Sequence, residues 1–262
     1  MPNHEDETVV DTQRLTAPQI FHAAVENAEE ELKRSPRKLA FSGFAGGITL
    51  GLTGLAVASV QGLLGDGSWQ SFVSYLFYPI GFIAVIIGRA QLFTENTLYP
   101  VVLVLDQRRH FLATLRLWGI VFSSNILGAL AFAFLAIRSG ALHQEIVAKL
   151  VKLGSAAVVG SSASLFWSGV IGGWLIALVA WMVTASHWTI GQVAMIWLLT
   201  FILGVGHFAH CIVTSGEILS SVLGGAVPGL TYLHWLLLAT LGNIVGGVVI
   251  VSLLNYGQVK EI

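Results

Sequence analysis

Long apolar blocks alternate with short polar segments along most of the chain. The blocks cover roughly residues 39–63, 72–105, 112–137, 161–185, 188–221 and 231–255. About 20 consecutive apolar residues form a helix long enough to cross the roughly 30 Å hydrocarbon layer of a bilayer. Membrane β-strands would instead alternate apolar and polar residues over about ten positions. The pattern therefore predicts an all-α membrane protein with six transmembrane helices.

The two halves of this pattern resemble each other. The segment SNILGAL at 124–130 recurs as GNIVGGV at 242–248, which places Asn125 and Asn243 118 residues apart. Because each half holds three spans, an odd number, the halves must have opposite orientations in the membrane. We therefore predict two inverted three-helix repeats, an arrangement found in membrane transport proteins.

Polar residues interrupt the second and fifth blocks, which are also too long. A helix of about 34 residues would measure roughly 51 Å, against about 30 Å of hydrocarbon. The interruptions read RAQLFTENT at 89–97 and GHFAHCIVTSGEIL at 206–219. We expect both helices to be broken there, with irregular backbone that is buried in protein or lines a cavity. Broken helices at matching places in two repeats indicate a transport path.

The chain before the first block is polar. Residues 16–34 place apolar side chains on one helical face. We predict an amphipathic helix that lies on the membrane surface or on the protein's own cytoplasmic face, or a solvated helix with no further role. The predicted organisation is a cytoplasmic segment at 1–38, a membrane domain at 39–255 and a cytoplasmic tail at 256–262.

Basic residues support this orientation. By the positive-inside rule, the clusters before the first block, between the second and third blocks and after the last block belong in the cytoplasm, as do both termini. The basic residues of these clusters are Lys33, Arg34, Arg37, Lys38, Arg108, Arg109, Arg116 and Lys260. Arg138, Lys149 and Lys152 are exceptions, in an outer loop of about 23 residues.

Composition narrows the functional classes. Hydrophobic residues make up 55% of the chain and charged residues 10%, where a soluble domain carries about 25% charged residues. A net charge of −1 offers no basic surface for nucleic acid. The single cysteine, Cys211, cannot form an internal disulfide. No nucleotide-binding loop or nucleophile motif is visible, so we expect neither an enzyme nor a pump driven by ATP, and no cofactor.

Two histidines fall in the interrupted part of the fifth block. A titratable side chain within a membrane span is costly, so His210 is a functional candidate, with a structural histidine as the alternative. His207 lies three residues earlier. An HxxH metal or haem pair is therefore a further alternative, although two ligands alone are weak support for one.

Charged and amide residues flank both interruptions. Arg89 and Glu95 would face different sides of a continuous helix, so Arg89 could pair with Glu95 only across a break, or else with Glu217 in the other half. We interpret these three residues as a structural polar cluster that pins the broken segments, together with Asn96, Asn125 and Asn243. The large apolar residues beside the breaks belong either to the core or to a pore constriction: Tyr78, Phe82, Phe93 and Leu203.

Three motifs resemble the formate/nitrite transporter family. They are LFTEN at 92–96, HCI at 210–212 and GNIVGG at 242–247. The resemblance covers about residues 39–255 in motif order and spacing. RAQ before LFTENT, and GEIL after the histidine segment, resemble the divergent YfdC-like branch of the family.

This resemblance implies an aquaporin-like six-helix protomer, a homopentamer in membrane lipid, and one pore per protomer for small monovalent anions such as formate, nitrite or hydrosulfide. It implies a bacterial inner membrane location. Matched to this chain, Leu92, Phe93 and Thr94 form the loop that interrupts the second helix, and His210 is the central pore histidine. The constriction positions of the family fall on Tyr78, Phe82 and Leu203.

The chain departs from the family pattern near the histidine. Ala209 stands where the family has a glutamate, Thr214 and Gly173 stand where it has asparagines, and Lys152 is the nearest candidate for its outer lysine. The expected function is pH-dependent transport of small anions through His210. The alternatives are a neutral-solute or water channel of the same fold, and a membrane metal or haem protein that uses both histidines.

Overall fold

The computed structural model describes residues 14–107 and 109–260, which form helices and connecting turns with no strand. The outer ends of the expected N-terminal segment and C-terminal tail, residues 1–13 and 261–262, lie outside the described part, as does residue 108. The first half contains α1 (Ala17–Lys33), α2 (Pro36–Leu64), α3 (Ser68–Tyr75), α4 (Ile80–Ile87), the 3-10 turn η1 (Glu95–Thr97), α5 (Tyr99–Gln107) and α6 (Phe111–Arg138). The second half contains α7 (Gln144–Ala157), α8 (Ser162–Thr184), α9 (Thr189–Val205), α10 (Val213–Leu223), α11 (Gly229–Val245), the π-helical segment η2 (Gly246–Leu253) and α12 (Leu254–Val259).

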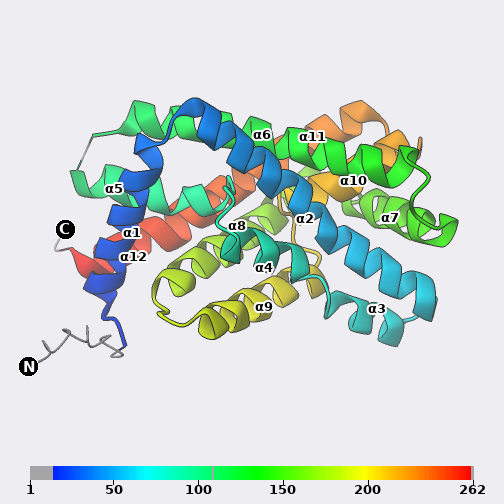
Figure 1. Cartoon of the computed structure of the whole chain (residues 1–262), viewed down its shortest axis with the longest axis horizontal. Coiled ribbons are helices and arrows are strands. Elements are labelled where there is room, and N and C mark those ends of the chain that lie inside the picture. Colours follow the sequence, from blue (N-terminus) through cyan, green and yellow to red (C-terminus); the bar gives the residue numbers. More distant parts are fainter. Residues whose placement is uncertain (1–13, 108, 261–262) are drawn as a thin grey trace, which may run out of the picture.

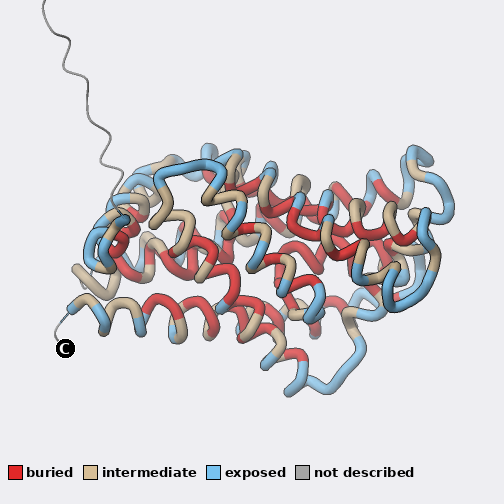
Figure 2. The backbone as a smooth tube through the Cα atoms, turned by 90° about the horizontal axis from the view of Figure 1, so that it is seen from below, coloured by how far each residue is buried: buried red, intermediate tan, exposed pale blue. Residues whose placement is uncertain are grey.

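Five helical segments in the described part are long and apolar enough to cross a membrane. They are Pro36–Leu64, Ser68–Ile87, Phe111–Arg138, Ser162–Thr184 and Gly229–Val259. Helices α9 and α10 are apolar but shorter. Large apolar side chains point outward from these segments, among them Phe41, Leu127, Phe134, Trp167 and Leu237. Figure 2 shows the buried backbone inside the bundle and the exposed backbone mainly at its connections. An outer surface of this kind suits contact with lipid.

Close helix pairs form the frame of the molecule. Helices α2 and α6 run side by side along it (Figure 1), and α8 and α11 pack in the same manner in the second half. Gly47 lies against the backbone of Asn125, and Gly173 lies against the backbone of Asn243. A side chain at either glycine would collide with the facing helix, so small residues allow each pair to approach.

Helix α1 packs on the protein's own surface, against α5, α8 and α12. The four residues of its buried face are Ile20, Phe21, Ala24 and Ala28. Gln19 caps the helix start by accepting a hydrogen bond from the backbone N–H of Thr16 at 2.8 Å. In Figure 1, α1, α5 and α12 gather at one end of the molecule and α3 and α7 at the other.

The connection after α6 differs from the prediction of a plain loop, because it contains the 14-residue helix α7. Leu150 and Gly154 are buried, and Gly154 lies against the backbone of Glu217 on α10. Glu145, Lys149 and Lys152 interrupt the apolar pattern of this helix, which is why it did not register among the long apolar blocks.

Candidate functional site

Helical structure is interrupted twice, and the two interruptions are alike in backbone conformation. The first lies between α4 and α5, and the second between α9 and α10. Arg89 and His207 both have left-handed backbone, with φ of 58° and 52°. They are 118 residues apart, the separation of Asn125 and Asn243. A non-glycine residue at positive φ is uncommon, so matching pairs indicate one local geometry built twice.

Asn125 on α6 holds the first interruption. Its Oδ1 accepts a hydrogen bond from the backbone N–H of Phe93 at 2.9 Å. Its Nδ2 donates to the carbonyls of Gly43 at 2.6 Å and Gln91 at 2.9 Å. Irregular backbone within a membrane needs partners for its polar groups. This amide binds two such groups, those of Gln91 and Phe93, and ties them to α2 through Gly43.

Asn243 on α11 makes the corresponding bonds at the second interruption. Its Oδ1 accepts from the N–H of Cys211 at 2.8 Å, and its Nδ2 donates to the carbonyls of Gly169 at 2.7 Å and Ala209 at 2.9 Å. Both asparagines are fully buried. The two amides therefore anchor the two interruptions in the same way.

Two serines complete this arrangement, and the sequence reasoning missed them. Ser42 Oγ accepts a hydrogen bond from the N–H of Gln91 at 3.1 Å, and Ser168 Oγ accepts from the N–H of Ala209 at 2.9 Å. The signal was present as FSGF at 41–44 in the first block and WSGV at 167–170 in the fourth. Each serine precedes a glycine whose carbonyl binds the anchoring asparagine.

His210 belongs to the second interruption, faces Thr94 of the first, and is fully buried. Its Nδ1 accepts hydrogen bonds from the backbone N–H groups of Ile212 at 3.3 Å and Val213 at 3.1 Å. An acceptor nitrogen carries no proton, so the neutral ring holds its proton on Nε2. That nitrogen lies 2.9 Å from Thr94 Oγ1, to which it donates in this tautomer. The ring of Phe82 stands edge-on to the imidazole, with 5.3 Å between ring centroids.

A cavity of about 410 Å³, here named the vestibule, opens on one side of His210. Its lining residues come from eight segments of the chain: Gln61, Asp66, Ser71, Tyr75, Tyr78, Lys152, Leu153, Ala156, Ala157, Leu203, Gly204, His207, Thr214 and Glu217. Thr214 connects the vestibule to the histidine, because its Oγ1 accepts a hydrogen bond from the N–H of His210 at 3.4 Å.

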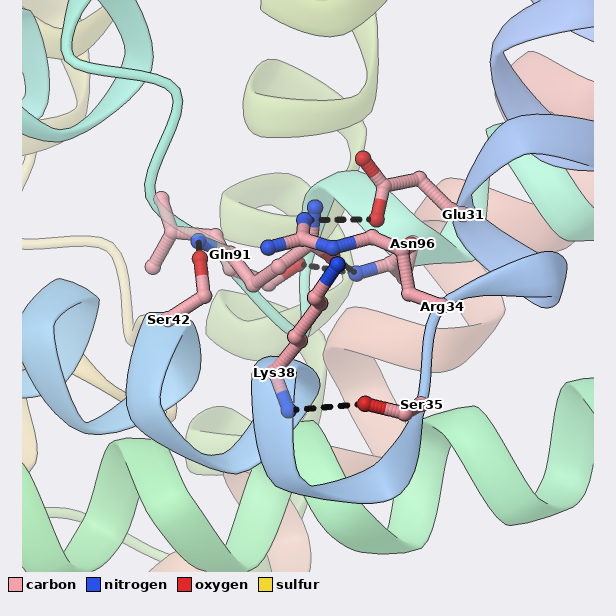
Figure 3. A network of polar contacts seen from close by, with 8 residues as sticks. Glu31, Arg34, Ser35, Lys38, Ser42, Gln91 and Asn96 are labelled. Carbon is pink, nitrogen blue, oxygen red and sulfur yellow. Dashed lines mark hydrogen bonds and ion pairs between the residues drawn. The ribbon is translucent and has the colours of Figure 1, made fainter.

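A smaller cavity of about 100 Å³, here named the α1 pocket, lies at the α1 end of the molecule. Asn27 and Glu31 of α1 line it together with Arg89, Gln91 and Glu95. Polar side chains of α1, α2 and the first interruption gather nearby (Figure 3), and Ser42 of α2 bonds Gln91 of the interruption. Among these side chains Arg34 is paired with Glu31 at 2.8 Å, and Asn96 Nδ2 donates to Gln91 Oε1 at 2.9 Å.

The structure brings only part of the predicted polar cluster together. Within residues 14–107 and 109–260, no ion pair within 4.0 Å joins Arg89 to Glu95 or to Glu217. Glu95 lines the α1 pocket with Arg89, whereas Glu217 lines the vestibule. The amide bonds of the two asparagines hold the interruptions instead, so the prediction that Arg89 pairs with either glutamate was wrong.

The predicted constriction residues lie at the vestibule, at His210 and in the first interruption. Tyr78 and Leu203 line the vestibule, and Phe82 contacts His210. Leu92 is fully buried. Phe93 packs its ring on Trp118 and Phe122 of α6, with centroid distances of 5.6 and 5.0 Å, which fixes the loop to that helix.

The two histidines do not form a shared metal-binding face. Helix α9 ends at Val205, and the left-handed backbone of His207 turns its side chain away from helical register with His210. His207 Nδ1 is instead 3.1 Å from the hydroxyl of Tyr75. Among the residues that the structure describes, no group of three or more His, Cys, Asp or Glu side chains could hold a metal ion.

One ion cluster borders the vestibule at the link between α2 and α3. Asp66 Oδ1 accepts from Lys149 Nζ at 2.8 Å and from Lys152 Nζ at 3.0 Å. These hydrogen bonds, that of Lys149 first, hold the pKa of the Asp66 carboxyl below its usual value. The two lysines of α7 are therefore engaged with the same carboxylate oxygen.

Comparison with known proteins agrees with this architecture. The sequence model described as Formate/nitrite transporter matches residues 18–257. The chain is 33% identical over 243 residues to the inner membrane protein YfdC of Escherichia coli (strain K12), covering 90% of this chain and 76% of that protein.

Two solved structures share the fold. An FNT family ion channel superimposes with a TM-score of 0.82 at 22% identity, covering 91% of this chain and 98% of that one. A pentameric formate channel with formate bound superimposes with a TM-score of 0.73 at 18% identity, covering 85% and 97%. The relatives are transporters and channels, not enzymes. This all-helical chain is thus an integral membrane protein that belongs to the formate/nitrite transporter family.

Proposed function

We propose that the chain is a transmembrane channel or transporter for small monovalent anions or their weak acids, of the formate, nitrite and hydrosulfide class. The observation that carries the proposal is the bond between His210 and Thr94, which joins the two interruptions of helical structure. The name of the pentameric formate channel and the family match support the solute class.

The proposed architecture has six spans in two inverted repeats, with the second and fifth spans broken at the two interruptions. The matching contacts of Asn125 and Asn243 support this symmetry. We also propose a homopentamer in lipid, with one aquaporin-like pore per protomer. The membrane domain, residues 39–255, would lie in an inner membrane, with the segment 1–38 and the tail 256–262 on the cytoplasmic side.

In this scheme the solute passes from the vestibule to the α1 pocket by way of His210. Tyr78, Leu203 and Phe82 form the apolar constriction, Leu92 and Phe93 hold the loop, and Thr94 and Thr214 offer hydroxyl groups. An ion pays a large desolvation cost in an apolar constriction, whereas a neutral acid does not. The Nε2–H of His210 donates to Thr94 beside this constriction. We assign to His210 the relay of a proton that is taken up from the solution: the proton passes to the anion directly or through water, the neutral acid forms, and the imidazole ends in the neutral state in which it began.

Stopped-flow measurement of solute uptake into proteoliposomes tests the proposal. The solutes are formate, nitrite, hydrosulfide and an uncharged solute, each at two pH values. We expect anion uptake that rises as pH falls, and in His210→Asn a loss of this uptake together with its pH dependence. His234 is an exposed histidine on α11, so His234→Asn is the matched control and retains it.

Each other outcome has a definite meaning. Unchanged pH-dependent uptake in a folded His210→Asn protein would remove His210 from the mechanism. Uptake of the uncharged solute alone would favour the neutral-solute channel. Uptake of none of the solutes by folded wild-type protein would overturn the proposal.

A further inference from the structure

Glu217 is an unusual residue for the wall of an anion path. It lies on α10, is 9% exposed and lines the vestibule. Its Cγ and Oε1 lie beside Gly54 of α2, where a Cβ would come within 3.0 and 3.4 Å of them. Within residues 14–107 and 109–260, no side chain forms a hydrogen bond or an ion pair with this carboxyl group.

The cations near the vestibule are already engaged. Lys149 and Lys152 both bind Asp66 Oδ1, and the Nδ1 of His207 faces the hydroxyl of Tyr75. Lys149 and Lys152 pair with Asp66, and none of these three forms an ion pair with Glu217, so an ionised Glu217 is a negative charge without a contacting cation in the vestibule wall. A buried charge without a partner is costly, and like charges repel strongly where water is scarce.

The elements that pack against α10 carry further titratable groups, and among the described residues none of these groups is a free cation lining the vestibule. Asp66 lies on the α2–α3 link, Tyr75 on α3 and Tyr78 on the turn that follows. Lys149 and Lys152 lie on α7, Arg138 on α6 and Tyr232 on α11. His207, His210 and Cys211 belong to the second interruption. Arg138 donates to the carbonyl of Leu223 at 2.9 Å, and Tyr232 donates to Ser215 at 3.1 Å.

We propose that Glu217 is a proton-binding group of the vestibule, and that an anion passes only when Glu217 is protonated. This inference rests on the proposed function. A proton from the solution forms an O–H bond on the carboxylate and returns to the solution when the pH rises. The protonated group removes the repulsion and offers a hydrogen-bond donor beside Thr214, one helical turn from the contact with His210.

Exchange of isotope-labelled formate across proteoliposomes tests this, with the same pH on both sides. Glu217→Gln has the shape of the neutral side chain and cannot ionise. We expect the ratio of its exchange rate to that of the wild type to be near one at low pH. Above the pH at which half of the Glu217 side chains are protonated, the protonated fraction in the wild type falls about tenfold per pH unit. The ratio of the variant's exchange rate to that of the wild type therefore rises by up to about tenfold per pH unit.

Two further variants make the flux result specific. Glu217→Asp keeps an acid in the vestibule and retains the pH dependence. Glu145→Gln removes an exposed carboxyl from α7, and its ratio to the wild type stays flat. A flat ratio for Glu217→Gln, or equal loss of its exchange at every pH, would overturn the proposal.

Infrared difference spectroscopy separates this proposal from the proposed function, because it detects the proton without transport. We expect a carbonyl-stretch band of a protonated carboxyl that titrates with pH in the wild type, is missing in Glu217→Gln and persists in Glu95→Gln. If no variant exchanges formate but this band behaves as expected, the proton site stands and the transport proposal fails. If Glu217→Gln keeps the band, the proton site is refuted.

Discussion

Removing an anchoring amide should destabilise the protein more than a typical substitution in a membrane helix. Asn125→Ala leaves three backbone groups without their partner: the N–H of Phe93 and the carbonyls of Gly43 and Gln91. The alanine side chain reaches none of them, and the site is fully buried, so water cannot replace the amide freely.

The magnitude follows from the number of bonds. Side-chain hydrogen bonds between membrane helices average about 0.6 kcal/mol, so the loss of three such bonds costs about 2 kcal/mol. Buried groups left without a partner cost about 1–3 kcal/mol each, which would raise the loss further. For a chain of this size, about 2 kcal/mol corresponds to a decrease in Tm of roughly 4–8 °C.

The change in Tm is measured by heating the protein in detergent and quantifying the remaining folded protein by size-exclusion chromatography. Asn243→Ala should lower the Tm by a similar amount, since it removes three bonds of similar length. Asn255→Ala is the matched control, because its side chain makes a single bond, to the carbonyl of Val251, in a helix near the C-terminus.

A clear result would refute this reasoning. If Asn125→Ala and Asn255→Ala shift the Tm equally, the amide does not anchor the interruption. If Asn125→Ala is strongly destabilising and Asn243→Ala is not, the two halves are not held in the same way despite their matching contacts.

Three further predictions concern other parts of the path. Thr94→Val should abolish anion uptake in proteoliposomes while Thr94→Ser retains it, because only serine keeps the hydroxyl that binds His210. Gly173→Ala should lower the Tm by several degrees, since its Cβ would meet the backbone of Asn243, whereas Gly229→Ala, with open space around it, should change the Tm little. Asp66→Asn should lower the Tm slightly at neutral pH. Because the pKa of Asp66 is lowered in the folded protein, this difference should vanish as pH falls through that pKa.

The apolar pattern located several helices closely. The blocks 39–63, 112–137 and 161–185 correspond to α2, α6 and α8, with bounds that differ by at most three residues. The pattern is strong there because nearly every position is apolar. It failed for α7, whose buried face is narrow and whose lysines point to the vestibule border.

The sequence identified the anchoring asparagines but not their contacts. A repeat of seven residues is enough to pair Asn125 with Asn243. It cannot show that each amide reaches across to a serine-glycine pair of another helix, because that contact depends on how closely the helices approach. The error over Arg89 has the same origin, since spacing along the chain does not reveal which of two cavities a charged side chain lines.

The backbone of the two interruptions and the side chains that line the vestibule play different parts in solute preference. Each anchoring amide accepts one hydrogen bond and donates two, and all three partners are backbone groups. These bonds therefore do not depend on which side chains the bonded residues carry. Ala209 illustrates this: its N–H and its carbonyl are both bound, by Ser168 and Asn243, while its side chain is free to differ from the family's glutamate. A frame built from backbone contacts tolerates exchange of the residues that face the path. We therefore expect solute preference to follow the residues of the vestibule, Glu217 above all, and not the anchored interruptions that position His210.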